Sequence, residues 1–424
     1  MGKQRKTKNI DLTVGNITSS LWKFAVPLML GNVLQQLYNL VDTWVVGHYI
    51  GDNALAAVGS SYTLMTFLTS IVIGLCLGSS AFLSMAYGKK DQDLIRNGIF
   101  ISAVMIGSLA VILTGIIYIW MNPMIRLLQV PQETTAAMRE YLFYVFIGFF
   151  ATFLYNYVAN VLRGIGNSVT PLFFLGISVI LNIFLDLYMV AVLNLGVAGA
   201  AYATFIAQGI SAVLSLIIFI VTLQKLPGKA EGWLSKTEFS DMSRIALPSI
   251  LQQSTVSIGM MLVQSVVNSF GTQILAGFSA AMRIESLCVV PMSAIGNAMS
   301  SYTAQNIGAE KEERISQGYR MGNFMIIVIA VILCLFLEIA HKPLIALFLD
   351  NAASSQTIVT GESYLKFIGF FFCMIGFKMA VDGILRGAGA VRVFTIANLV
   401  NLTLRVTIAK FGAPIWGVSM VWYA

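Results

Sequence analysis

Two aspartates lie in stretches of the sequence that are otherwise almost entirely apolar. Asp42 stands on a stripe with Gln35 and Asn39 at the spacing that shares one helix face, and Asp186 follows Asn182 by four residues. Ionisable side chains inside apolar spans cost a few kcal/mol each, so they face a cavity or a partner rather than lipid. The two aspartates therefore indicate a site for a proton or a cation.

The chemistry of this site depends on the depth of the two carboxylates. At about 1.5 Å per residue, Asp42 and Asp186 each lie more than about 20 Å along their helices, which places both in the outer half of the same helical bundle. Carboxylates that share a desolvated cavity titrate as a coupled pair, and a proton taken up there can bias a conformational equilibrium. The alternative is a structural role, in which each carboxylate satisfies an interhelical hydrogen bond.

The composition defines the elements that must carry these side chains. The chain has 424 residues, of which 57% are hydrophobic and 11% charged, and this excludes a soluble protein. Its apolar runs are continuous and long enough to span a bilayer as helices, unlike the alternating strands of outer-membrane barrels. We predict an all-α polytopic membrane protein with about twelve spans, near 20–48, 54–86, 98–121, 138–162, 168–192, 196–223, 244–270, 273–304, 319–340, 359–385, 391–411 and from Gly412.

The basic residues predict the orientation of the chain in the bilayer. The 26 lysines and arginines exceed the 19 acidic residues, and most of them fall in alternate short loops or near the N-terminus. Cytoplasmic loops carry this excess, so we expect a cytoplasmic N-terminus in the plasma (inner) membrane. The positive net charge is therefore explained by the cytoplasmic loops of a protein in a lipid bilayer, and it implies no nucleic-acid partner.

The two halves of the sequence resemble each other at an offset of about 220 residues. Phe24-Ala25-Val26-Pro27 matches Ile245-Ala246-Leu247-Pro248, and three further pairs follow in register: Gly51 to Ala56 with Gly271 to Ala276, Tyr87-Gly88-Lys89-Lys90 with Ile307-Gly308-Ala309-Glu310, and Leu162 to Gly166 with Leu385 to Gly389. We predict an N-terminal lobe over 1–223, a cytoplasmic linker over 224–241 and a C-terminal lobe over 242–424. Repeats of this kind are typical of secondary transporters.

The repeat also predicts the length of the last span. The sixth span of the first half runs over about 28 residues, whereas 13 residues follow Phe411 in the second half. Because about 20 residues are needed to cross a bilayer, we expect the chain to stop inside its last helix and the full protein to be longer.

Other residues offer weaker candidates. In the second lobe, Arg283, Glu285 and Asp382 either face a cavity or make local contacts, and Asp382 precedes Arg386 by four residues on one helix face. Pro27 and Pro248 occupy equivalent places in the two repeats and are candidate hinges, since proline kinks a helix; a static packing kink is the alternative. The sequence contains no phosphate-binding loop of an ATP motor and no nucleophile or metal constellation of an enzyme.

Several motifs resemble the multidrug and toxic compound extrusion (MATE) family. They are Val41-Asp42-Thr43-Trp44-Val45-Val46-Gly47, Leu162-Arg163-Gly164-Ile165-Gly166-Asn167 with Pro171, Leu181-Asn182-Ile183-Phe184-Leu185-Asp186 and Leu195-Gly196-Val197-Ala198-Gly199-Ala200. In the second half, Arg283-Ile284-Glu285-Ser286 and Gln305-Asn306-Ile307-Gly308-Ala309 are similar to the prokaryotic DinF/MepA-like branch. The resemblance extends over the whole chain.

The resemblance implies twelve helices in two six-helix lobes arranged as a V. It also implies a cation-coupling site formed by Asp42 and Asp186 with Asn182, Tyr141, Asn160 and Thr204, where Na+ would meet Asp42, Asn182, Asp186 and Thr204. The NorM-like branch places a glutamate early in the seventh helix, whereas this chain has Gln252, Gln253 and Gln264 there. This departure favours the first lobe over the second as the coupling site.

We therefore expect a monomeric exporter of lipophilic cations, coupled to H+ or Na+ and requiring no other cofactor. Its substrate cavity would contain Gln35, Asn39, Asp42 and Asp186. Two alternatives stay open, a flippase for lipid-linked precursors from the same superfamily and a membrane-embedded enzyme. A flippase would need arginines to meet phosphates, and the first lobe offers acids and amides instead.

Overall fold

The helical architecture is clear in the computed structural model, which describes residues 9–50, 52–127, 132–227, 235–348 and 354–423. Within these ranges the chain forms helices and no β-strand. Eleven of the described helices are long and apolar enough to cross a membrane. The predicted all-α, multi-pass fold is confirmed.

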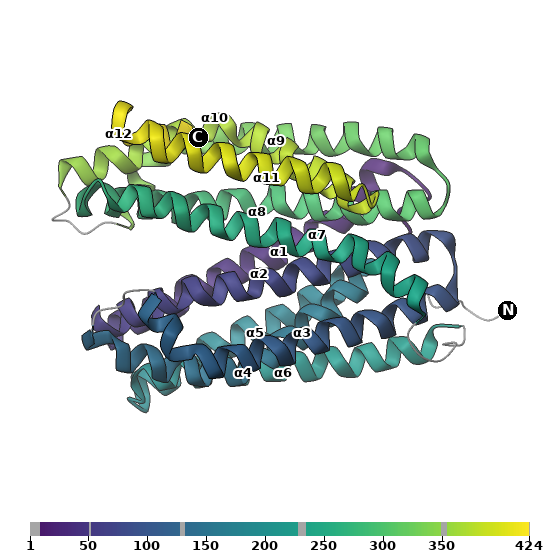
Figure 1. Ribbon diagram of the computed structural model, residues 1–424, viewed down its shortest axis with the longest axis horizontal. Helices are drawn as coiled ribbons and strands as arrows, with labels where there is room; N and C mark the ends of the chain where they lie inside the picture. The colour runs from purple at the N-terminus through teal and green to yellow at the C-terminus, as the bar shows by residue number, and fades with distance from the viewer. Residues whose placement is uncertain (1–8, 51, 128–131, 228–234, 349–353, 424) are drawn as a thin grey trace.

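The helices form two bundles whose axes run roughly along the long axis of the molecule (Figure 1). The first lobe contains α1 (Ile17–Tyr49), α2 (Asp52–Lys89), α3 (Gln92–Leu127), α4 (Gln132–Gly164), α5 (Val169–Asp186), the π-helix η1 (Leu187–Val192) and α6 (Gly196–Lys225). The second lobe contains α7 (Lys236–Asn268), α8 (Thr272–Gly308), α9 (Glu312–Ala346), α10 (Ser355–Gly387), α11 (Val391–Thr407), the π-helix η2 (Ile408–Gly412), α12 (Ala413–Trp416) and α13 (Met420–Tyr423). We call the end of the bundle that carries the N-terminus the N-terminal end, and the opposite end the distal end.

Most helices extend several residues beyond the apolar runs that predicted them. Polar caps account for some of these extensions, because a cap satisfies backbone amides that a helix start leaves free. The Asn16 side chain accepts from the amide of Ser19 at the start of α1, and the Ser235 hydroxyl accepts from the amide of Glu238 at the start of α7. Helix α7 thus begins inside the predicted linker, whose residues 228–234 lie outside the described part, as does Gly51 of the repeat motif.

The predicted start of a twelfth span at Gly412 is wrong. The helical path continues from α11 through η2 into α12, so that Val391–Trp416 forms one candidate span. Pro414 lies in the first turn of α12, directly after the π-turn η2. The break comes at Gly417, whose φ of 88° repeats the positive φ of Gly196, and α13 begins three residues later.

The first helix of each repeat packs partly on the opposite lobe. The beginning of α1, with Leu21, Phe24 and Leu28, shares a buried apolar cluster with α8 and α9 of the second lobe. The beginning of α7 packs in turn on α2 and α3 of the first lobe, where Ala246 and Met242 are fully buried. Farther along, α1 packs on α5 and α7 packs on α11.

Pro27 and Pro248 lie inside α1 and α7, close to the point where each helix changes lobes. Their proposed role as hinges and the division of the chain into domains stay predictions.

Candidate cation site in the first lobe

Asp42, Asn182 and Asp186 are buried in the first lobe. Their exposed fractions are 8%, 1% and 0%, respectively. At about 1.5 Å per residue, Asp42, Tyr141 and Thr204 lie about 10 to 14 Å from the distal ends of α1, α4 and α6. Asp186 is the last residue of α5, directly before η1. That this end of the bundle faces outward stays a prediction.

The fold brings four helices together around the two aspartates. Asp42 and Asp186 are close enough to interact electrostatically, and both also interact with Tyr38 and Tyr141. The hydroxyls of Tyr38 and Thr204 lie 3.2 Å apart, which links α1 to α6 beside this pair. We call Asp42, Asn182, Asp186, Tyr38, Tyr141 and Thr204 the acidic cluster.

The acidic cluster contains polar atoms that the protein itself leaves without a partner. Among the described residues, no hydrogen bond reaches either carboxylate oxygen of Asp186, the Oδ1 atom of Asp42 or the side-chain amide of Asn182. Buried polar atoms are rarely left unpaired in native proteins, and each such atom needs an explanation. Carboxylate, amide and hydroxyl oxygens are hard ligands that suit hard cations, and two carboxylates can also share a proton. The residues present therefore fit either H+ or Na+.

Hydrogen bonds between α5 and α6 position Asn182 and Asp186. The Ser178 hydroxyl donates to the carbonyl of Ala207 at 3.1 Å, and the Ser211 hydroxyl donates to the carbonyl of Phe174 at 3.3 Å. Small polar residues of this kind join helices in membranes, where apolar side chains gain nothing by leaving lipid. They hold α5 against α6 about two to three turns before Asp186.

Apolar packing positions the rest of the acidic cluster. The ring of Tyr141 belongs to a buried group that includes Val45 and Val46 of α1, Val190 of η1 and Ala200 of α6. With Val58 of α2, this group joins five elements at the level of Asp42, so the site rests on packed helices rather than on loops.

A π-helical turn begins directly after Asp186. The Leu193 amide donates to the carbonyl of Tyr188 at 3.0 Å, which is the i to i+5 pattern of η1. In the second lobe, η2 begins directly after Thr407, 221 positions later in the chain. π-Turns inside helices occur often at functional sites.

Asn160 does not join the acidic cluster. It lies one turn from the end of α4 at the N-terminal end of the bundle, where its backbone carbonyl accepts from the Ser80 hydroxyl at 2.8 Å. Its side chain lines a small cavity between the lobes together with Phe24, Leu28, Leu77, Ser80, Arg163, Asn297, Ser300 and Ser301. The family resemblance that suggested Asn160 carries no information about depth, and depth separates Asn160 from Asp186.

The remaining first-lobe candidates show local contacts. Gln35 is exposed, and Asn39 donates to the Gln36 side chain at 3.4 Å on its own helix. Both stand on the same face of α1 as Asp42, and their role in a substrate cavity stays a prediction.

The candidates in the second lobe form two separate groups. The Tyr364 hydroxyl donates to Glu285 at 2.5 Å, while Arg283 is exposed. Asp382 forms an ion pair with Lys378 at 2.5 Å and accepts from Asn398 at 3.3 Å. Of the two environments considered for Asp382, the structure therefore shows the ion pair, with Lys378 as its partner.

The sequence reasoning missed Tyr38 and the π-turns. Tyr38 precedes Asp42 by four residues, a spacing that places both side chains on one helix face and would have identified it. The π-turn after Asp186 leaves no comparable signal in the composition of Leu187–Val192.

The comparisons with known proteins identify the family. The MatE family model matches residues 27–188 and 248–410, one match in each half of the chain. The chain belongs to this family of multidrug and toxic compound extrusion transporters, which are not enzymes.

Among curated relatives, the probable multidrug resistance protein YpnP of Bacillus subtilis (strain 168) is 33% identical over 93% of this chain and 88% of its own. An FAD transporter of Shewanella oneidensis is 23% identical over 77% of this chain and 74% of its own. A solved outward-facing MATE transporter of the MOP superfamily matches with a TM-score of 0.88 and 25% identity, covering 99% of this chain and 94% of the other. The chain is thus a multi-pass membrane protein of a transporter family.

Proposed function

We propose that this protein exports cationic amphipathic compounds across the plasma membrane in exchange for H+ or Na+, with its N-terminus in the cytoplasm. The coupling ion would bind at the acidic cluster of the first lobe. The observation that carries the proposal is the pair of interacting buried aspartates, Asp42 and Asp186, whose carboxylate oxygens include three that no hydrogen bond from the described residues reaches.

The acidic cluster would act by serving two ligands in turn. For antiport, the coupling ion and the substrate must prefer opposite states of the transporter. A lipophilic cation attracted by the two carboxylates would leave when H+ or Na+ neutralises them. Thr204 and Tyr38 would keep α1 and α6 in register during this exchange, since their hydroxyls are hydrogen-bonded.

The names of the relatives support transport of small compounds, but they do not identify the substrate of this chain. YpnP carries the name of a probable multidrug resistance protein, whereas the FAD transporter carries a different cargo. The acids and amides of the first lobe favour a positively charged substrate here, because a phosphate-bearing cargo would need arginines in that place.

Ethidium efflux from proteoliposomes tests the proposal. A pH gradient and a Na+ gradient are imposed separately on the wild-type protein and on the Asp42→Asn and Asp186→Asn variants. We expect one gradient to drive efflux in the wild type and neither gradient to drive it in the variants. Asp241→Asn is the matched control, since its carboxylate is exposed near the start of α7.

Unimpaired efflux by folded Asp42→Asn protein would refute the role of the acidic cluster. Absence of ethidium efflux under either gradient in the wild type would refute the substrate class, and would point to an anionic or lipid-linked cargo.

A further inference from the structure

A segment before α1 connects the two lobes at the N-terminal end of the bundle. We call residues 10–15 the strap. An Asx turn holds its shape, because the Asp11 carboxylate accepts from both the amide and the hydroxyl of Thr13, at 2.8 and 2.6 Å. The backbone carbonyls of the strap are thereby presented in a fixed arrangement.

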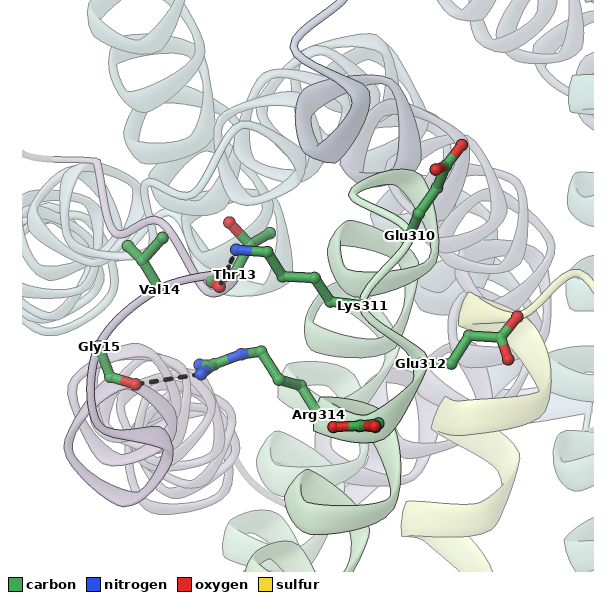
Figure 2. Close-up of a pocket in the computed structure, with 8 residues that line it drawn as sticks. Thr13, Val14, Gly15, Glu310, Lys311, Glu312 and Arg314 are labelled. Atoms are coloured by element: carbon green, nitrogen blue, oxygen red, sulfur yellow. Dashed lines mark hydrogen bonds between the residues drawn. The ribbon is translucent and has the colours of Figure 1, made fainter.

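The strap is bound to the second lobe by several hydrogen bonds. The Leu12 amide donates to the Gln305 side chain at 3.0 Å, and the Asn306 side chain donates to the Leu12 carbonyl at 3.2 Å. Figure 2 shows the two charged contacts, in which Lys311 donates to Thr13 at 3.0 Å and Arg314 donates to Gly15 at 3.2 Å. Hydrogen bonds with a charged donor are stronger than hydrogen bonds between two neutral groups.

The Leu12 side chain strengthens this attachment. It is fully buried in the same apolar cluster as Met299 and Tyr302 of α8. Burying a leucine side chain removes apolar surface from water and so stabilises the attachment. The strap is therefore an integral part of the second lobe.

A single backbone hydrogen bond reaches the first lobe from the described part of the strap. The Ile10 amide donates to the carbonyl of Gly166 at 2.8 Å, in the turn between α4 and α5. Gly166 has a φ of 86°, and a Cβ atom there would collide with the Ile10 carbonyl. The strap thus touches both lobes, also through Asp11, which lies near Tyr87 of α2, but most of its described hydrogen bonds to other elements go to the second lobe.

The two lobes also meet directly beside the strap, through two glycines that the sequence repeat makes equivalent. A Cβ atom on Gly88 of α2 would collide with the backbone of Gln305, and a Cβ atom on Gly308 of α8 would collide with the backbone of Met85. The contact is reciprocal, as expected for a pair related by the repeat. Only glycine permits this approach, because the obstructing atoms belong to backbone rather than to flexible side chains.

We infer that Gly88, Gly308 and the strap form a gate that closes the N-terminal end of the transporter, and that the strap travels with the second lobe when the gate opens. Opening separates α2 from α8 and breaks the bond between Ile10 and Gly166, while Leu12 and the bonds to Gln305, Asn306, Lys311 and Arg314 stay in place. The gate lies at the opposite end of the bundle from the acidic cluster and does not depend on which ion drives transport.

Spin labels at three exposed positions test this inference by pulsed electron–electron distance measurements in full-length protein. Val14 reports on the strap, Lys90 on the first lobe and Glu313 on the second. Gly88→Ala and Gly308→Ala each place a methyl group against the facing backbone and so disfavour the closed gate from either lobe. We expect each variant to raise the ratio of open to closed protein by about tenfold or more.

In the open population, the distances from Lys90 to Glu313 and from Lys90 to Val14 should lengthen together, while the distance from Val14 to Glu313 should stay constant. Gly107→Ala is the matched control, because a Cβ atom there meets no neighbour within 4 Å.

An unchanged distance from Lys90 to Glu313 in both folded glycine variants would overturn the gate. A strap that keeps its distance to Lys90 and leaves Glu313 would overturn its attachment to the second lobe. None of these readouts uses transport, so failure of the gate is distinguishable from failure of the proposed antiport.

Discussion

Tyr38 of α1 and Thr204 of α6 hold their hydroxyl oxygens 3.2 Å apart, four residues along α1 from Asp42. This contact ties α1, the helix that carries Asp42, to α6. It makes the geometry around Asp42 sensitive to a change as small as the loss of one hydroxyl.

Replacing Tyr38 with Phe should weaken binding of the coupling ion without unfolding the protein. A neutral hydrogen bond contributes about 0.5–1.5 kcal/mol, so we expect about a two- to tenfold loss of apparent ion affinity in gradient-driven efflux. Thr204→Val should give a similar loss, and combining the two should add little. Tyr49→Phe is the control, since Tyr49 is exposed at the end of α1. Additive effects of the two substitutions would show that the hydroxyls act separately.

The pH dependence of substrate binding follows from competition at the same carboxylates. Lowering the pH from about 8 to about 6 should weaken ethidium binding, because protonated carboxyls no longer attract a cation. Asp186→Asn should bind ethidium more weakly at the higher pH and lose most of this dependence. Fluorescence anisotropy of ethidium with purified protein measures both effects. Binding that strengthens on acidification would contradict competition.

The ion pair between Lys378 and Asp382 should stabilise the fold rather than drive transport. Asp382→Asn leaves Lys378 without its carboxylate inside a membrane span. Because the lysine side chain is 38% exposed, the cost should lie below the about 3–5 kcal/mol of a fully buried pair. We expect a lower melting temperature for this variant in detergent. The double variant Lys378→Met with Asp382→Leu should recover most of the stability and keep gradient-driven efflux. Loss of efflux in a stable double variant would assign Asp382 to the transport machinery.

Close packing of α8 against α10 gives a further stability prediction. A Cβ atom on Gly383 would collide with the carbonyl of Gly296, so Gly383→Ala forces these helices apart. Overpacking of this kind typically costs about 1–3 kcal/mol. Gly176→Ala, where a Cβ atom meets nothing within 4 Å, should leave the melting temperature unchanged or slightly raised. Equal melting temperatures for the two variants would show that α8 and α10 separate without cost.

The membrane spans and the depth of the two cluster aspartates could be predicted from the sequence for the same physical reason. A bilayer imposes a minimum apolar length on each helix, so the number of residues before Asp42 and Asp186 already determines their depth. The same arithmetic separates Asn160, which lies one turn from the end of α4, from Asp186. The family resemblance alone did not make this separation.

Features that depend on contacts between distant residues could not be predicted in this way. The π-turn after Asp186 is one such feature, because the residues of Leu187–Val192 are compatible with an ordinary helix. The break at Gly417 is different: it lies 221 positions after Gly196, which also has a positive φ, so the repeat could have predicted it. The hydroxyl pair of Tyr38 and Thr204 needs α1 and α6 to be neighbours, and no spacing within one helix encodes that relation.

The beginnings of α1 and α7 each pack on the opposite lobe, and this has a consequence for the order in which the protein folds during synthesis. While α1 to α6 are being synthesised, the start of α1 lacks the surface of α8 and α9 that buries Phe24, and α2 lacks the α7 backbone that closes on Gly74 and Gly78. Neither half of the chain can complete its interior by itself. Assembly in the membrane must finish as one cooperative step after the second repeat is inserted, so a break in the chain between α6 and α7 would yield two halves that are stable only together.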